Sequence, residues 1–388
     1  MKKLLVLALM LVLGLSLVGM AADKIGVVLD VGGKGDLSFN DMAILGAQKA
    51  AEKYGMEYTV LQSFSEDDYL PNLRTLADDG SFVVIVGVGF LLGNAMDVVT
   101  QEYPDQKFAI IDFPNLTGAP NLMGLVFNEN EMSALVGALS GMLAAYHGYD
   151  TIGLVLGAEI PVLYHFEGGY RFGIDYGIKK YNELFGTDAS VSLVYSYTGY
   201  FDRPDVGYST GKTQLEQGAV SIFNVAGQLG IGMEEAVTEF HNNAGTTLGP
   251  PYFLGVDANQ DYLGLGMHAL ASGLKRVDVA VDKAITDTLE GTFEGGTTVF
   301  NLANGGVGIS RAADLLDFIP VGINGGKATD ADYYTIIQNW SANRAALPYA
   351  FWEQIDLLEQ EIIAGNILVP YANTLDEILQ VRADYPLE

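Results

Sequence analysis

Short apolar runs alternate with amphipathic stretches from residue 24 onward. The apolar runs predict strands, and the stretches with apolar residues at helical spacing predict helices. The predicted strands are 24–29, 57–61, 82–87, 107–112 and 122–127, and the predicted helices are 40–54, 67–79 and 93–102. Strands that alternate with helices in this way indicate an α/β fold, with a parallel sheet covered by helices on both faces.

The second half of the chain repeats this alternation with a different sequence. The predicted strands are 151–156, 191–197, 220–225, 252–255 and 306–310; the predicted helices are 131–146, 170–184, 211–217, 233–242, 271–289, 330–342 and 349–364, followed by an apolar segment at 366–371. Two α/β units with segments left over at the end indicate two lobes that exchange chain more than once. No Pro/Ser-rich stretch separates the halves, so we expect crossing strands rather than a tether.

Polar, glycine and aromatic residues follow several predicted strands. Asp30 follows the first strand, the segment 87–90 ending in Phe90 follows the third, and Asp112 ends the fourth. Ligands of open parallel sheets bind beyond the carboxyl ends of the strands. The segment 30–41, DVGGKGDLSFND, is therefore the first candidate for a binding loop, because its glycines allow a tight turn that exposes backbone groups.

The N-terminus has the pattern of a secretory signal peptide. A basic start, an apolar stretch from Leu4 to Val18 and small residues up to Ala22 favour a signal peptide at 1–21, with cleavage after Ala22 as the second choice. The alternative is an uncleaved anchor, but the stretch is near the short end for a membrane span. The chain has no cysteine, so it cannot carry a lipid on one, and we expect a soluble extracytoplasmic or periplasmic protein.

The charge excludes some partners. The formal net charge is −28, and removal of Lys2 and Lys3 with a signal peptide would make it −30. Such a surface repels nucleic acid polymers and anionic membranes. We expect a monomer.

Motifs for catalysis are incomplete. The segment 206–213 ends like a phosphate-binding loop, but Val206 stands where the first glycine is required. Ser272 and Lys275 fit a Ser-x-x-Lys pair without its partner motifs. The four histidines have no metal-ligand spacing, and the glycine runs lack the dinucleotide spacing. This pattern favours binding over catalysis, with no cofactor and no metal.

An ordered set of short motifs resembles a known family. The motifs are DVGG at 30–33, DLSFND at 36–41, FNENE at 127–131 before GALSG at 137–141, YTGYFD at 197–202, VAG at 225–227, GVD at 255–257, LKRVDVA at 274–280 and NLANGGVG at 301–308. Over nearly its whole length the chain resembles the basic membrane protein family, the PnrA-like purine nucleoside receptors of ABC transporters.

The resemblance implies a type I periplasmic-binding-protein fold with two Rossmann-like lobes. The lobes would comprise 22–127 with 256–303 and 128–255 with 304–388, joined by crossings near 125–130, 253–258 and 300–308. It also implies a receptor that hands a nucleoside, purine by preference, to permease subunits. Two departures stand out: members of the family are usually lipoproteins, and VAGQLG at 225–230 lacks a glycine and a threonine that the family tends to have.

The resemblance also implies roles for single residues. Phe39 would stack on one face of the base and Phe201, or its rival Phe223, on the other. Asn40, Asp41 and Asp112 are candidates for the base edge, and Asp257, Lys275 and the Gly227 backbone for the ribose. Asp30, Ser38 and Phe90 complete the candidate ligand-binding set.

Other interpretations of these residues and of the function stay open. Asn40 or Ser38 could cap a helix, Phe39 could be a hydrophobic staple, and Lys275 could pair with Asp278 or Asp257. The alternative functions are the same fold binding a sugar or a signalling ligand, a sensor subunit, and a nucleoside-acting enzyme. Against the enzyme, the sequence lacks the clustered aspartates that we expect of a nucleoside hydrolase.

Overall fold

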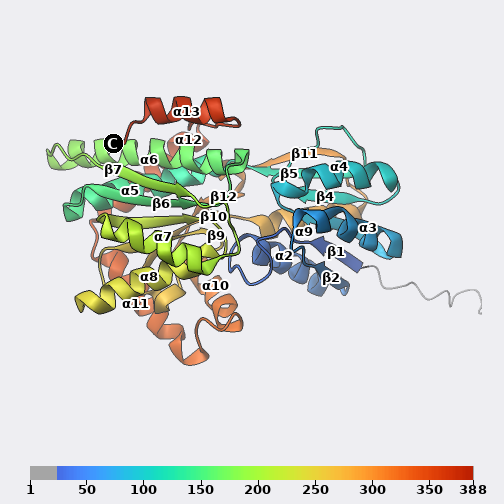
Figure 1. Cartoon of the computed structure of the whole chain (residues 1–388), viewed down its shortest axis with the longest axis horizontal. Coiled ribbons are helices and arrows are strands. Elements are labelled where there is room, and N and C mark those ends of the chain that lie inside the picture. Colours follow the sequence, from blue (N-terminus) through green and yellow to red (C-terminus); the bar gives the residue numbers. More distant parts are fainter. Residues whose placement is uncertain (1–23, 388) are drawn as a thin grey trace, which may run out of the picture.

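The computed structural model describes residues 24–387, which fold around two six-stranded sheets (Figure 1). The predicted signal peptide at 1–21 lies outside these residues. In spatial order the first sheet contains β11 (Gly296–Phe300), β5 (Leu122–Phe127), β4 (Phe108–Ile111), β3 (Phe82–Val88), β1 (Lys24–Val28) and β2 (Glu57–Leu61). The second contains β12 (Val307–Ile309), β10 (Ala269–Lys275), β9 (Tyr252–Asp257), β8 (Ala219–Val225), β6 (Thr151–Leu156) and β7 (Ser192–Tyr197).

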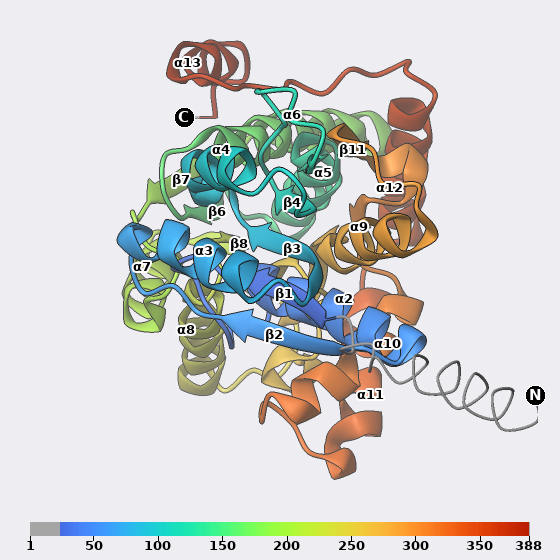
Figure 2. The ribbon, with the colours of Figure 1, turned by 90° about the vertical axis from the view of Figure 1, so that its right-hand side faces the viewer.

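The strand pairs of the first sheet are all parallel, and its central strands β1, β3 and β4 are buried on both faces. Val84 and Val86 of β3 pack in the cluster with α2 (Phe39–Tyr54) and α9 (Val277–Glu290), whereas Ile85 packs with α3 (Tyr69–Asp79) and α4 (Gly93–Glu102). Burial on both faces explains why β3 is apolar throughout instead of alternating with polar residues. Figure 2 shows these helices around the first sheet.

The second sheet is parallel except for β12, which runs antiparallel to β10. One face is covered by α5 (Glu129–His147) and α6 (Pro161–Phe185), the other by α7 (Pro204–Glu216) and α8 (Leu229–Ala244) (Figure 1). The late helices are α10 (Ala312–Asn324), α11 (Tyr333–Ala345), α12 (Tyr349–Ile363) and α13 (Leu375–Asp384); α12 packs on α5, and α13 packs on α6.

Glycines bring α5 and α6 into backbone contact. Gly169, Gly173 and Gly177 of α6 recur every fourth residue and face α5. A Cβ atom on any of them would lie 2.1–2.2 Å from a carbonyl oxygen of α5. Since no real Cβ approaches an oxygen so closely, the helix pair depends on glycine at these positions.

The chain crosses between the sheets three times, after β5, after β10 and after β11. The prediction of two parallel-sheet lobes joined by three crossing segments is confirmed. The place of the second crossing is wrong, because β9 and β10 both pair in the second sheet and the chain leaves it between Lys275 and Val277. The helix predicted at 271–289 is correct from 277 onward, where α9 begins, but residues 271–275 belong to the strand β10. We propose lobes of 24–127 with 277–300 and 128–275 with 307–387.

Candidate functional site

A pocket lies between the two lobes, beyond the carboxyl ends of strands from both sheets. It encloses about 580 Å³ of space between atoms, part of it open to solvent. Its lining residues are Asp30, Gly32, Asp36, Phe39, Asn40, Gly89, Phe90, Leu91, Asp112, Ile160, Val162, Leu163, Phe166, Phe201, Val225, Gly227, Asp257 and Lys275. Nine of the twelve predicted ligand-binding residues are among them.

The first loop is organised by Asp36, which sequence analysis did not single out. Its carboxylate accepts hydrogen bonds from the backbone N–H groups of Ser38, Asn40 and Asp41, at 2.8–3.0 Å. These are donors that the start of a helix leaves without partners, so Asp36 caps α2. The side chain of Ser38 makes no capping bond. Asp41 points back into the loop and accepts from Gly35 and Leu37, so it does not line the pocket.

The cap places Asn40 in the floor of the pocket with a fixed orientation. Its Nδ2 donates to Asp30 Oδ1 at 2.9 Å and to Asp36 Oδ2 at 3.2 Å. Because both partners are carboxylate oxygens, the amide nitrogen must face them. Asn40 Oδ1 is therefore directed elsewhere, and it is buried without a hydrogen-bond partner among residues 24–387.

Two further acceptors lie at strand ends. Asp112 follows β4 and Asp257 ends β9, both with left-handed backbone at φ 67° and 62°, a conformation that aspartate tolerates better than most residues. Asp112 Oδ2 accepts from Lys275 Nζ at 2.6 Å, and Asp257 Oδ2 from the Ser38 hydroxyl at 3.1 Å. The other oxygen, Oδ1, of each aspartate is buried and has no partner within the described chain.

Burial dominates the protonation of these carboxyls. It raises the pKa of Asp112 to about 7, although the Lys275 charge opposes the shift. It raises the pKa of Asp257 to about 6 against the opposing effects of Lys275 and the Ser38 hydroxyl. Burial also raises the pKa of Asp30. A ligand that donates hydrogen bonds to these oxygens would favour their charged forms.

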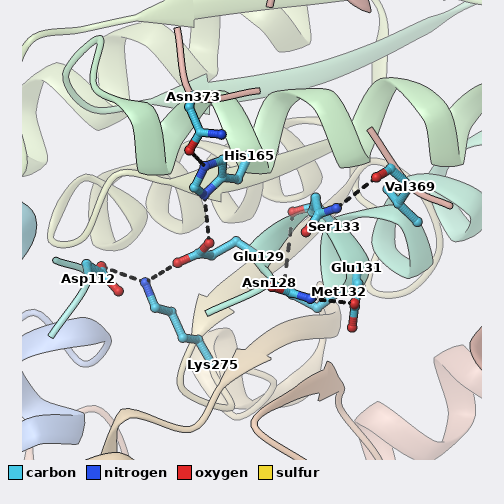
Figure 3. A network of polar contacts seen from close by, with 11 residues as sticks. Asp112, Asn128, Glu129, Glu131, Met132, Ser133, His165, Lys275, Val369 and Asn373 are labelled. Atoms are coloured by element: carbon cyan, nitrogen blue, oxygen red, sulfur yellow. Dashed lines mark hydrogen bonds and ion pairs between the residues drawn. The ribbon is translucent and has the colours of Figure 1, made fainter. Parts of the chain in front are cut away.

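Lys275 ends β10 and connects the two lobes (Figure 3). It is 1% exposed, and its ammonium lies 2.6 Å from Asp112 Oδ2 of the first lobe and 2.9 Å from Glu129 Oε1 of α5. Burial alone would lower the pKa of Lys275, but the surrounding carboxylates outweigh burial and raise it, so the side chain stays charged. The alternative pairing of Lys275 with Asp278 does not occur, because Asp278 pairs with Arg276 and Lys49.

Four phenylalanine rings contribute apolar surface. Phe39 begins α2 and Phe90 follows β3, both on the first-lobe side; Phe166 lies on α6 and Phe201 in the loop after β7, on the second. The ring of Phe201 lies against Gly157, where a Cβ would come within 2.1 Å of it. Phe223, the rival to Phe201, does not line the pocket: it is fully buried in β8 and packs against Tyr170.

Sequence analysis missed the residues whose partners are distant in sequence. Phe166, Glu129 and His165 lie on helices, where nothing in the local pattern separates them from core or surface positions. Ser38 was included, but it lies behind the pocket wall and donates to Val256 O and Asp257.

Within residues 24–387, no cluster of three or more metal-binding side chains is arranged around an ion site.

Comparison with known proteins identifies the family. A family model described as ABC transporter substrate-binding protein, PnrA-like (Bmp), matches residues 23–321. The chain belongs to the Bmp family. It is therefore a substrate-binding protein of the ABC transporter type, which binds a small ligand outside the cytoplasm and pairs with a permease.

Relatives and solved structures agree with this assignment. A solute-binding protein of an ABC transporter system from Aeropyrum pernix K1 superposes with a TM-score of 0.84 at 33% identity, covering 94% of this chain and all of that one. An uncharacterized lipoprotein of Pyrococcus furiosus is 36% identical, covering 92% of this chain and 88% of its own length. An ABC transporter nucleoside-binding protein, BmpA, of Lactococcus lactis is 28% identical over 73% of this chain and 80% of its own.

The Pyrococcus relatives are named lipoproteins, whereas the present sequence contains no cysteine. Across residues 24–387, no helix is both long and apolar enough to cross a bilayer.

Proposed function

We propose that this Bmp protein binds a nucleoside, purine by preference, in the interlobe pocket and delivers it to its permease. The observation that carries the proposal is the set of three buried oxygens without partners: Asn40 Oδ1, Asp112 Oδ1 and Asp257 Oδ1. A buried acceptor without a donor costs about 1–3 kcal/mol. A nucleoside supplies donors at two ends, the N–H groups of its base and the hydroxyls of its ribose.

The aromatic residues support a flat, apolar component in the ligand. Phe39 and Phe201 belong to opposite lobes, so lobe closure would bring one ring to each face of a base. Each base–aromatic stack contributes roughly 1–3 kcal/mol. Asn40 and Asp30 lie next to Phe39 and would take the base edge, while Asp112, Asp257 and Lys275 would take the ribose. The nucleoside-binding relative from Lactococcus lactis supports the same ligand class.

The charge of the pocket supports a nucleoside over a nucleotide. Among the described residues that line it, Asp30, Asp36, Asp112 and Asp257 carry carboxyl groups, and Lys275 carries the positive charge. Lys275 is already paired with Asp112 and Glu129. A phosphate would thus meet four buried carboxyl groups and no cation free to pair with it, and its burial would be costly.

The test is ligand-induced thermal stabilisation of protein refolded from denaturant, which removes bound ligand. We expect adenosine, guanosine or inosine to raise the unfolding temperature, because a ligand at 100 times its Kd adds about 2.7 kcal/mol to the free energy of unfolding. Ribose and nucleoside monophosphates should have no effect. Phe39→Ala and Phe201→Ala should each weaken binding about 10- to 100-fold. Phe64→Ala removes an exposed ring outside the pocket and is the matched control. Stabilisation by sugars alone would refute the nucleoside.

A further inference from the structure

A line of polar contacts, buried as far as His165, runs from the pocket to the C-terminal segment (Figure 3). Glu129 uses both carboxylate oxygens, Oε1 toward Lys275 Nζ at 2.9 Å and Oε2 toward His165 Nδ1 at 3.0 Å. His165 Nε2 lies 3.1 Å from Asn373 Oδ1. Glu129 and His165 are 1% and 5% exposed and do not line the interlobe pocket. Both line a neighbouring pocket that shares Phe90, Asp112 and Val162 with the interlobe pocket. On a ligand in the interlobe pocket itself, they act through Lys275.

The outer end of this line is held on several sides. The Tyr371 ring stacks on His165, with centroids 3.8 Å apart and planes at 20°. Asn130, next to Glu129 on α5, donates to Val369 O at 3.0 Å. Beyond Asn373, α13 is fixed to α6 by Arg382, which donates two hydrogen bonds of 2.8 Å to the buried Glu167. Residues 369–373 are thus docked on the first turns of α5 and α6.

These contacts determine where the Lys275 ammonium lies. An ammonium has three donors on a flexible stem, and Asp112 and Glu129 take two of them. Phe39, Phe127 and Phe166 surround it, with ring centroids 5.0–5.8 Å from Nζ. If Glu129 turned away, the Lys275 ammonium could move with it. Its third N–H would then no longer be available to the ligand, and its ion pair with Asp112 would break. His165 keeps Glu129 from turning by occupying its other oxygen.

We propose that Glu129 and His165 are positioning residues for ligand binding, and that the segment 369–373, which lies beyond the family match at 23–321, anchors them. They orient Lys275, and through it Asp112, for the sugar side of the ligand. That the sugar is the part of the ligand affected rests on the proposed function. That Glu129 and His165 orient Lys275 does not depend on the identity of the ligand.

His165→Phe tests the proposal, because it keeps a flat ring for Tyr371 but removes the bond to Glu129. We expect inosine affinity to fall about tenfold while hypoxanthine, the base without its ribose, binds within about twofold of wild type. His165→Gln restores an amide donor and should recover part of the affinity. Asn373→Ala, a milder change in the anchor, should weaken inosine binding about threefold. His147→Phe, the same exchange at the far end of α5, is the control.

A second measurement needs no ligand. In protein labelled with ¹⁵N-lysine, the Nζ signal of Lys275, assigned through Lys275→Met, should shift or broaden in His165→Phe and Asn373→Ala but not in His147→Phe. An unchanged signal in both variants overturns the proposal, as does an equal loss of inosine and hypoxanthine binding. If wild type binds no nucleoside, the proposed function fails while the Lys275 signal still decides whether Glu129 and His165 position the lysine.

Discussion

Single carboxyl groups show how this protein gives up stability for binding. Asp257 is buried with one oxygen unpaired, which is unfavourable in the empty protein and useful when a ligand donates to it. Its pKa of about 6 lies above the ordinary value of 3.8. The folded state therefore holds the proton more tightly than the unfolded state, and this group's contribution to stability decreases as the pH rises from 4 to 6.

Asp257→Asn should remove that pH dependence. The exchange keeps the shape and an acceptor for Ser38, but it replaces a titrating group with a neutral one. Between pH 4 and pH 7.5 the free energy of unfolding should change in favour of the variant by up to about 3 kcal/mol, while ligand binding is lost. Urea unfolding at a series of pH values measures this, with the exposed Asp105→Asn as the control. Parallel profiles for variant and wild type would contradict the role given to burial.

Asp36 shows at the scale of the element how a cap sets a binding loop. It receives three N–H groups of the first turn of α2, and that turn carries both Phe39 and Asn40. The helix start and the pocket floor are therefore one structure. A loop that only had to form a turn would not need a carboxylate at Asp36.

Asp36→Ala should cost about 1–2 kcal/mol of stability through loss of the cap and should weaken ligand binding at least tenfold by releasing Phe39 and Asn40. Asp332→Ala removes a carboxylate that accepts the Thr329 N–H at the start of α11, away from the pocket, and should destabilise the protein with little change in affinity. Urea unfolding and titration calorimetry separate the two effects. Normal affinity in Asp36→Ala would show that the cap does not place the binding residues.

Elements also show what the sequence could and could not predict. Most of the first sheet was predictable, because β1, β3 and β4 are buried on both faces and are followed by polar residues that line the pocket, as Asp30 and Asp112 do. The edge strand β11 was not predicted, because it is short, partly exposed and paired only with β5. The strand β10 was mistaken for helix, because its alanines and glycine have low strand propensity and the helical pattern of α9 follows directly. Its conformation is decided by pairing with β9 and β12, which local sequence does not contain.

The two lobes of the whole molecule are linked by side chains as well as by the crossings. Gln228 at the start of α8 donates to Gly32 O at 2.8 Å, and Gln260 donates to Leu37 O at 3.1 Å. Lys275 with Asp112, and Ser38 with Val256 and Asp257, form further links. Gln228 follows Gly227, and its acceptor Gly32 lines the pocket as Gly227 does, so this link joins the lobes at the pocket wall.

Gln228→Ala should speed ligand release. One hydrogen bond of about 1 kcal/mol corresponds to a dissociation rate about fivefold higher, with a much smaller effect on the association rate and on the stability of the empty protein. Stopped-flow displacement of bound ligand measures the rate. Gln101→Ala, whose amide contacts only its own helix, is the control, and equal release rates for both variants would exclude Gln228 as a link.

The glycine contacts between α5 and α6 limit which substitutions this protein can accept during evolution. Every codon change that replaces Gly169, Gly173 or Gly177 with another residue adds at least one carbon atom where α5 backbone already lies. The two helices would have to separate, and they carry Glu129 and His165 at their first turns. Variation at three positions outside the pocket is thereby constrained by the same geometry that holds Lys275 in place.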